Sequence, residues 1–252
     1  MERRCSTIAA ATRSSSADEV RHLLTPPRKR GVEILDLPDV DPGIVTRSLA
    51  DVAKANALFG GTSAVIDEIK EVLKILPRKA TLLDVGTGLG DIPYRARAVA
   101  RQSGVAITTI GLDSAPELAS ANTSAVNFSV CGDALRLPFP DQSIDIVMCS
   151  QVLHHFAGDD ALKLLCEMNR VARVRVIVSD LRRSWIAAAG LWLASFPLRF
   201  HAVSRHDGVV SVMRGFTPTE LTGTVHQAIA RKPVTHRRLG FRLTTSWAPL
   251  HR

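Results

Sequence analysis

The residues with the clearest chemical potential are three closely spaced glycines that follow an apolar run. Residues 82–91 read LLDVGTGLGD, with glycines at positions 86, 88 and 90. Glycines at this spacing let the backbone turn tightly against a ligand, where a Cβ atom would collide with it. Because the spacing differs from the Gly-x-Gly-x-x-Gly of dinucleotide sites, a pyrophosphate is not the expected ligand. The segment predicts a loop that holds a small cofactor.

Polar side chains end the apolar runs that come next. Counting the run before the glycine loop as the first, the second and third runs end with Asp113 and Asp133. The fourth run ends at Ser150, and Gln151 comes next. Ligands of open α/β sheets bind outside the carboxyl ends of the strands, so we expect these side chains to meet Asp84 and the glycine loop in one crevice. A carboxylate some twenty residues beyond such a loop is well placed for ribose hydroxyls. The alternative is that the two aspartates only cap the helices that follow them.

Residues 82–156 resemble the cofactor half of the class I S-adenosylmethionine-dependent methyltransferases. The stretch contains LLDVGTGLGD, GLD, GDALRLPFPDQSIDIV and CSQVLHHF in that order, over about a third of the chain. Outside it there is looser similarity to small-molecule methyltransferases of bacterial secondary metabolism. The resemblance implies S-adenosylmethionine as cofactor, with S-adenosylhomocysteine as product. The residues it assigns to the cofactor are Asp84, Gly86, Thr87, Gly88, Gly90, Asp113, Ser114, Asp133, Ala134, Ser150 and Gln151.

The same resemblance implies how the cofactor is divided among these residues. The three glycines and Asp84 would border the methionine part, Asp113 the ribose, and Asp133 with Ala134 the adenine. Ser150 and Gln151 would lie at the sulfonium end. The implied fold is a Rossmann-like, mostly parallel seven-stranded α/β sheet with an antiparallel edge strand, helices on both faces and an N-terminal helical lid.

The elements around this half can be placed from sequence patterns. Residues 1–31 mix Ser, Thr, Arg and Pro and predict a flexible arm. Residues 32–77 predict a lid of two helices, the first capped by Asp41 and the second running from Thr62 or Ser63 to Leu76. The methyltransferase domain is expected over residues 78–252, with a strand over 174–180, a substrate-side insertion at about 182–215 and a final hairpin over 234–247.

Candidate acceptor residues come from the lid and the insertion. In the lid, Arg47, Asn56 and Phe59 could approach the methyl group, although Asn56 and the Gly60–Gly61 pair could equally do no more than end a helix. In the insertion, Trp185, Trp192 and Phe196 predict an apolar wall for an aromatic acceptor. A core helix or an oligomer face explains the insertion about as well.

Three histidines are candidates for a general base. A sulfonium methyl is already activated, so the protein mainly has to align the acceptor and, for a phenol or an acid, to take its proton. His155, just after the fourth run, is the best placed, with His154 second and His206 third. No His-x-His, His-x-x-x-His or Cys-x-x-Cys spacing is present, so no metal is predicted.

Composition limits the partners. The chain carries a net charge of +8, and the basic surplus lies in the last third, where residues 173–252 hold thirteen Lys or Arg against three acids. Such a surface could attract RNA or an anionic membrane, but only 5% of the residues are aromatic and no RNA-binding motif is found. We therefore disfavour nucleic acid as a partner. The apolar stretch at 185–200 is shorter than a bilayer requires, so no transmembrane segment is expected.

The sequence thus predicts a cytoplasmic enzyme that moves a methyl group from S-adenosylmethionine to an oxygen of a small aromatic or polyketide-like acceptor. The four cysteines and the lack of a signal-peptide pattern fit a reducing compartment. An RNA or protein methyltransferase is the first alternative, and a non-catalytic S-adenosylmethionine-binding module is the second. A homodimer through the tryptophan-rich insertion stays open.

Overall fold

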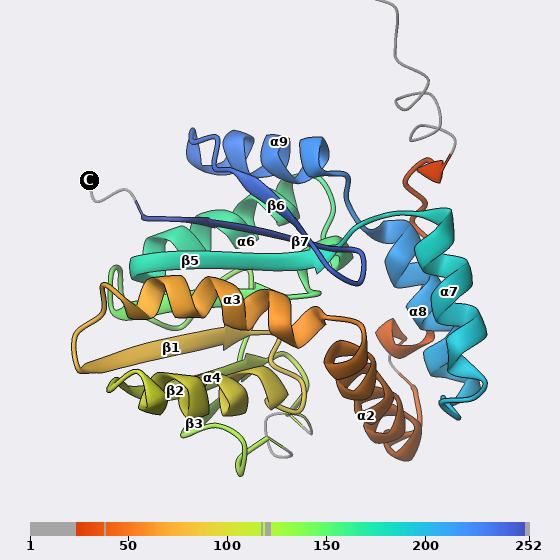
Figure 1. Cartoon of the computed structure of the whole chain (residues 1–252), viewed down its shortest axis with the longest axis horizontal. Coiled ribbons are helices and arrows are strands. Elements are labelled where there is room, and N and C mark those ends of the chain that lie inside the picture. Colours follow the sequence, from red (N-terminus) through yellow and green to blue (C-terminus); the bar gives the residue numbers. More distant parts are fainter. Residues whose placement is uncertain (1–23, 38, 117, 119–121, 250–252) are drawn as a thin grey trace, which may run out of the picture.

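A seven-stranded sheet in the order β3-β2-β1-β4-β5-β7-β6 forms the centre of the molecule (Figure 1). The computed structural model describes residues 24–37, 39–116, 118 and 122–249. Five strands are parallel, and β7 runs antiparallel to both β5 and β6. The strands are β1 (Lys79–Val85), β2 (Ala106–Asp113), β3 (Phe128–Cys131), β4 (Ile144–Ser150), β5 (Ala172–Leu181), β6 (Thr235–Arg238) and β7 (Arg242–Trp247). The mostly parallel, Rossmann-like sheet predicted from the sequence is confirmed.

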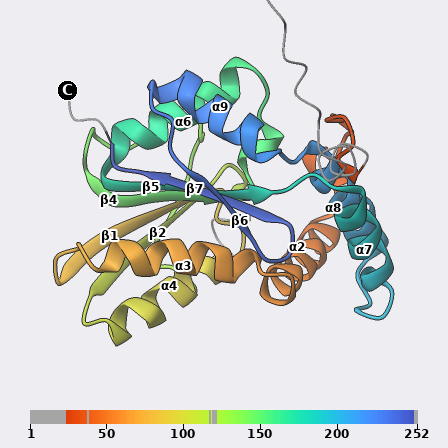
Figure 2. The ribbon, with the colours of Figure 1, turned by 45° about the horizontal axis from the view of Figure 1, so that its top comes forward.

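Helices cover both faces of the sheet and one end of it. The helices are α2 (Pro42–Leu58), α3 (Gly61–Leu73), α4 (Asp91–Gln102), α6 (Asp159–Val171), α7 (Trp185–Ser195), α8 (Ala202–Arg214) and α9 (Pro218–Ile229), with 3-10 turns η1 (Ile34–Asp36) and η2 (Leu153–His155). In Figure 2, α3 and α4 lie below the sheet and α6 and α9 lie above it. Helices α2, α7 and α8 stand beyond the carboxyl ends of the parallel strands (Figures 1 and 2).

The two sheet faces carry separate apolar clusters because side chains alternate along a strand. Leu82 of β1 and Ile146 of β4 pack with α3 and α4. Their neighbours Leu83 and Val147 pack with α6 and α9 on the opposite face. Strands β1 and β4 are therefore buried on both sides, which fixes the position of the residues at their carboxyl ends.

Local signals in the sequence account for several element ends. Asp41 caps α2 by accepting hydrogen bonds from the backbone of Gly43 and Ile44. Thr217 and Glu220 form a reciprocal capping box at the start of α9. Helix α3 begins at Gly61 and ends at Leu73, three residues before the predicted end.

The described part of the predicted arm lies against the end of α8. Lys29 N donates to Met213 O, and Arg28 Nε donates to Arg214 O at 2.7 Å. The Arg28 guanidinium also lies 4.0 Å from the centre of the Phe216 ring. Residues 24–31 are thus held in place, whereas the rest of the arm lies outside the described residues.

None of the helices in the described ranges is long and apolar enough to cross a membrane.

Candidate active site

One large cavity of about 760 Å³ lies at the carboxyl ends of the parallel strands. Its floor is formed by the glycine loop after β1, the end of β2 and the segment after β4, and its walls by η1, α2 and α8. Apolar side chains cover much of the wall. They are Leu35, Leu37, Val40, Val45, Leu49, Val52, Phe156, Leu181, Leu191 and Phe200. The cavity therefore combines a polar floor with an apolar wall.

The glycine loop approaches the cavity with its backbone. Gly86, Gly88 and Gly90 have φ angles of 71°, 53° and 75°. At Gly86, a Cβ atom would lie 2.5 Å from Cγ2 of Val152, so the loop after β1 can pass the segment after β4 only without a side chain. This close approach brings Val152 into the cavity beside the loop.

Asp84 and Thr87 point unsatisfied polar atoms at this floor. Asp84 is 3% exposed, and its Oδ1 has no hydrogen-bond partner within the described residues, nor does Oγ1 of Thr87. Burial raises the pKa of Asp84 well above its usual range; the nearby Thr87 side chain opposes this rise, and the charges of Asp91 and Asp113 add to it. A buried carboxyl with a free acceptor oxygen is a place for a cationic or hydrogen-donating ligand group.

Asp113 at the end of β2 braces the loop and also lines the cavity. Its two carboxylate oxygens accept hydrogen bonds from Gly88 N at 3.1 Å and Ala115 N at 3.2 Å. Each oxygen keeps a further lone pair, so the capping interpretation and the ligand interpretation are compatible. Ser114 follows it in the cavity wall.

A hydrogen-bonded group joins the segment after β4 to the lid. Gln151 has a positive φ of 59°, which is uncommon for a residue other than glycine. Its Oε1 accepts from Arg242 Nη1 at 2.7 Å, and its Nε2 donates to Asn56 Oδ1. Arg242 is buried, which lowers its pKa to about 10, while the charge of Asp180 acts the other way. Asn56 of α2 is therefore held at the cavity by its side chain as well as by its helix.

His154 lines the cavity, and its Nε2 lies 3.8 Å from Glu33 Oε1. Asp180 at the end of β5 accepts from His154 Nδ1 at 2.7 Å and from His154 N at 3.0 Å. Burial alone would raise the pKa of Asp180, but the charge and hydrogen bonds of His154 outweigh burial and lower it. Because an ionised carboxylate only accepts, Nδ1 carries a proton, and Nε2 has a lone pair whenever the ring is neutral. That Nε2 is buried and has no hydrogen-bond partner in the part of the chain described.

His155 lies in a different environment, among acids. Its Nδ1 is 3.2 Å from Asp36 Oδ1, and its Nε2 is 3.9 Å from Glu33 Oε2. Burial lowers the pKa of His155, but the hydrogen bond with Asp36 and the charge of Glu33 outweigh it and raise the pKa. Burial also disfavours the charged form of Asp36 and so raises its pKa. Hydrogen bonds with His155 and Arg214 outweigh burial and lower this pKa to about 2.

Glu33, His154 and His155 place three ligand-type atoms within 4.8 Å of one another. Arg214 already supplies a cation to this group, since its Nη1 lies 3.0 Å from Glu33 Oε1 and 3.3 Å from His155 Nδ1. A bound metal ion would have to compete with this guanidinium. A metal-free site therefore stays our prediction.

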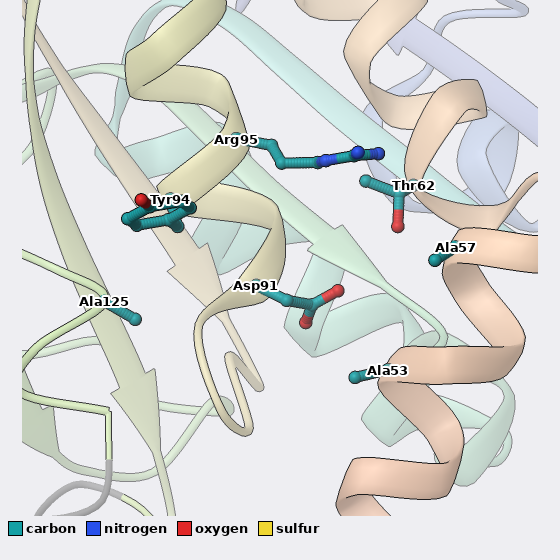
Figure 3. Close-up of a pocket in the computed structure, with 7 residues that line it drawn as sticks. All are labelled: Ala53, Ala57, Thr62, Asp91, Tyr94, Arg95 and Ala125. Atoms are coloured by element: carbon teal, nitrogen blue, oxygen red, sulfur yellow. The ribbon is translucent and has the colours of Figure 1, made fainter.

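A smaller cavity of about 300 Å³ adjoins the main one between α2, α3 and α4 (Figure 3). Asp91 and Ala53 line both cavities. Figure 3 shows Asp91 and Arg95 extending from α4 toward the lid helices, with Arg95 reaching Thr62. Burial raises the pKa of Asp91, and the charge of Arg95 opposes this in part. A cation and an anion on one helix thus face the lid beside the glycine loop.

The predicted site residues divide into two groups. The following line the main cavity: Asp84, Gly86, Thr87, Gly88, Asp113, Ser114, Ser150, Gln151, Asn56, His154 and His155. The remainder do not line it: Gly90, Asp133, Ala134, Arg47, Phe59, His206, Trp185, Trp192 and Phe196.

The second group lies elsewhere for identifiable reasons. Gly90 packs against Ala125 at the start of α4, and Asp133 is exposed and accepts from Leu135 N. Arg47 is exposed and donates to Arg199 O, and Phe59 lies at the junction of α2 and α3. His206 is half exposed, and only its neighbour Asp207 faces the cavity.

Trp185, Trp192 and Phe196 of the expected apolar wall instead lie on the outside of α7. They are 46%, 48% and 49% exposed. The inner side of α7 carries Ala188 and Leu191, which pack with α8. The insertion does reach the cavity, but through Leu191, Phe200 and residues of α8 rather than through these three aromatic side chains.

Several residues that line the cavity or hold its lining residues were not foreseen from the sequence. Asp180 ends an apolar run just as Asp84 and Asp113 do, so its strand-end position was a usable signal. Arg242 is one of several arginines in the alternating sequence of the final hairpin, and no local signal distinguishes it from the others. Glu33 and Asp36 come from a short segment without periodicity, and their pairing with Arg214 across the chain has no local signal.

Comparison with known proteins agrees with this geometry. Residues 83–178 match the family model described as a methyltransferase domain. A demethylmenaquinone methyltransferase of Deinococcus radiodurans is 34% identical over 151 residues, which cover 56% of this chain and 58% of that protein. One of Roseiflexus sp. is 29% identical over 179 residues, covering 65% of this chain and 73% of that protein. The chain thus spans less than two thirds of the Deinococcus protein.

Solved structures share the fold at low sequence identity. An S-adenosylmethionine-dependent methyltransferase of Aquifex aeolicus superposes with a TM-score of 0.54 and 17% identity, over 84% of this chain and all of that one. Magnesium protoporphyrin IX methyltransferase of Synechocystis PCC 6803 with bound S-adenosylhomocysteine gives 0.52 and 12%, over 94% and 95% of the two chains.

The strand order, the glycine loop and the family match together define a class I methyltransferase fold. The cofactor of this class is S-adenosylmethionine, and the site fits it. The unsatisfied Asp84 oxygen offers an acceptor to the methionine part, and the glycine loop lines the cavity beside it. Asp113 retains lone pairs for hydroxyls.

Proposed function

We propose that this protein transfers a methyl group from S-adenosylmethionine to a hydroxyl oxygen of a small, largely apolar acceptor of the aromatic or polyketide type. The observation that carries the proposal is the buried His154–Asp180 pair at the cavity, in which His154 Nε2 has no hydrogen-bond partner among the described residues and lies 3.8 Å from Glu33 Oε1. Both relatives are named demethylmenaquinone methyltransferases, which supports an apolar aromatic acceptor rather than a macromolecule.

Each residue of the site then has a defined task. The bound cofactor supplies an activated methyl group. Asp84 receives donors of its methionine part, and Asp91 with Arg95 offers the charge pair that matches an ammonium and a carboxylate. Asp113 accepts the ribose hydroxyls.

His154 acts on the acceptor. Its Nε2 accepts the hydroxyl proton while Asp180 holds the ring in the required tautomer and stabilises the imidazolium that forms. The apolar wall excludes water, so the acceptor rather than water meets the methyl group. His155 is already engaged by Asp36 and Arg214, so it positions η1 rather than serving as base.

The test combines binding and transfer. Calorimetry with S-adenosylhomocysteine should show binding at one site per chain. Incubation with labelled S-adenosylmethionine and a panel of phenolic and hydroxylated polyketide acceptors should give products whose mass increases by one methyl group. Hydrolysis or NMR of the product decides whether oxygen or carbon carries the new methyl, and carbon methylation would refute the oxygen assignment.

Two other functions are separated by the same experiment. Labelled methyl in RNA or protein, with salt-sensitive RNA binding, would favour a macromolecular substrate, as the basic last third of the chain suggests. Cofactor binding without transfer to any acceptor would favour a binding module. The His154–Asp180 pair argues against the module, because binding alone requires no oriented base.

A further inference from the structure

The outer face of α7 is apolar and uncovered. Five large side chains on it are between 46% and 61% exposed, namely Trp185, Ile186, Trp192, Leu193 and Phe196. At 3.6 residues per turn, positions 185, 186, 192, 193 and 196 fall on one side of the helix. Residues 185–198 include no charged side chain. A helix that is apolar all round is normally buried on all sides, so this face requires a partner.

Basic side chains border this face at both ends. The Lys29 ammonium lies 5.9 Å from the Trp185 ring, and the Arg205 guanidinium lies 4.3 Å from the Phe196 ring. Lys54 of α2 reaches over to donate to Leu198 O at 3.0 Å. Residues 181–206 contain four arginines and neither Asp nor Glu. The rim therefore favours a partner with negative charge around an apolar interior.

We propose that the α7 face docks on the surface of an anionic phospholipid bilayer. Aromatic and aliphatic side chains with flanking Lys and Arg are the features of helices that lie in a membrane interface. At 11 residues the helix is ~16 Å long, too short to span a bilayer, so it lies in the interface plane. The inference goes beyond the proposed methyl transfer and does not depend on it.

The charge pattern disfavours the other occupants. Two copies packed through α7 in antiparallel fashion would bring Lys29 of one copy near Arg205 of the other, and like charges would oppose each other. Nucleic acid would require the charge within the face, where only apolar side chains lie.

Docking would place the cavity at the membrane. Leu191, on the inner side of α7, lines the cavity together with Gly208 and Ser211 of α8. Figure 1 shows α7 as the outermost element at this end of the molecule, with α8 between it and the sheet. A lipophilic acceptor could then pass from the bilayer to the site without crossing bulk water.

Vesicle co-sedimentation of the full chain tests the proposal. We expect binding to phosphatidylcholine vesicles that contain phosphatidylglycerol, weaker binding to phosphatidylcholine alone, and loss of binding at high salt. Leu193→Glu should weaken binding about 10- to 100-fold, because it puts a charge where one apolar side chain would enter the bilayer. Ile75→Glu is the matched control: Ile75 is 60% exposed, as Leu193 is 61%, but it lies between α3 and the amino end of β1. Lys29→Gln should weaken binding about five-fold.

Because Leu193 is exposed, the substitution should leave the melting temperature unchanged, and a large drop would show that the face is covered within the chain. The proposal is also overturned if the wild-type protein stays in solution with both vesicle types. A dimer by light scattering that Leu193→Glu dissociates would make the face an interface between copies. Binding to RNA that survives the substitution, in a chain that ignores vesicles, would assign the basic rim to nucleic acid.

Discussion

Replacing Asp180 with Asn tests the His154–Asp180 pair directly. Asp180 accepts three hydrogen bonds: Oδ1 takes His154 Nδ1 and Leu181 N, both at 2.7 Å, and Oδ2 takes His154 N at 3.0 Å. An asparagine has only one acceptor oxygen. If that oxygen takes the place of Oδ1, its amide group faces the donor His154 N. If it takes the place of Oδ2, the amide faces both Nδ1 and Leu181 N.

Both arrangements have a measurable cost. Each leaves at least one buried backbone N–H without an acceptor, which should lower the free energy of unfolding by about 1–3 kcal/mol. The second arrangement also favours the tautomer with the proton on Nε2, which cannot accept a proton from the substrate. We expect kcat to fall by about 100- to 10,000-fold, the range of a lost general base. Affinity for S-adenosylhomocysteine should stay within about two-fold, because Asp180 does not line the cavity.

The assay is steady-state methyl transfer with calorimetry and chemical unfolding on the same samples. Asp145→Asn is the matched control, because Asp145 is also buried and bonded to a backbone N–H, that of Thr81, but lies at the far end of β4. It should lose stability and keep kcat. A kcat for Asp180→Asn close to that of the control would refute the reasoning.

Further predictions concern the loop and the acidic group. Gly86→Ala should weaken S-adenosylhomocysteine binding at least about 10-fold by calorimetry, because the new Cβ would displace Val152 and strain a backbone with positive φ. Gly223→Ala is the control and should bind normally, because Gly223 is helical and has open space at its Cβ position. Asp36→Asn should destabilise the protein more at pH 5 than at pH 9. Charged His155, whose pKa is raised on folding, stabilises the fold below about pH 6.5. Charged Asp36, whose pKa is lowered on folding, stabilises it above about pH 4, so the pair contributes most between these pH values. Urea unfolding at both pH values measures this; since Asp36 is 40% exposed, the difference should be under about 1 kcal/mol, and an equal loss at both would contradict it.

The cofactor half of the molecule was predictable because its signals are local. Apolar runs that end in Asp84 and Asp113 specify strands whose carboxyl ends meet in a parallel sheet, and the glycine loop marks where a ligand approaches. Asp180 follows the same rule and could have been named on that ground. Asp133 follows it as well, yet its side chain turns toward Leu135 N and solvent.

The acceptor side was less predictable because it depends on contacts between distant segments. Trp185 and Trp192 had the residue types of a pocket wall, but the side of a helix that faces inward is decided by its partner, and α8 packs against Ala188 instead. His155 rather than His154 was expected to serve as base. Only the position of Asp180, 26 residues away, distinguishes the two adjacent rings, because it holds His154 while His155 pairs with Asp36.

The turn between β6 and β7 touches the base of the lid. A Cβ atom on Gly240 would lie 1.7 Å from Phe59 O, and one on Gly60 would lie 2.9 Å from Leu239 O, so two backbones meet here without side chains between them. This junction cannot slide or widen without breaking that contact. Any movement of α2 that admits an acceptor must therefore pivot about residue 60 and swing its opposite end, near Pro42. Strands β6 and β7 thus fix the pivot of an entrance formed by α2.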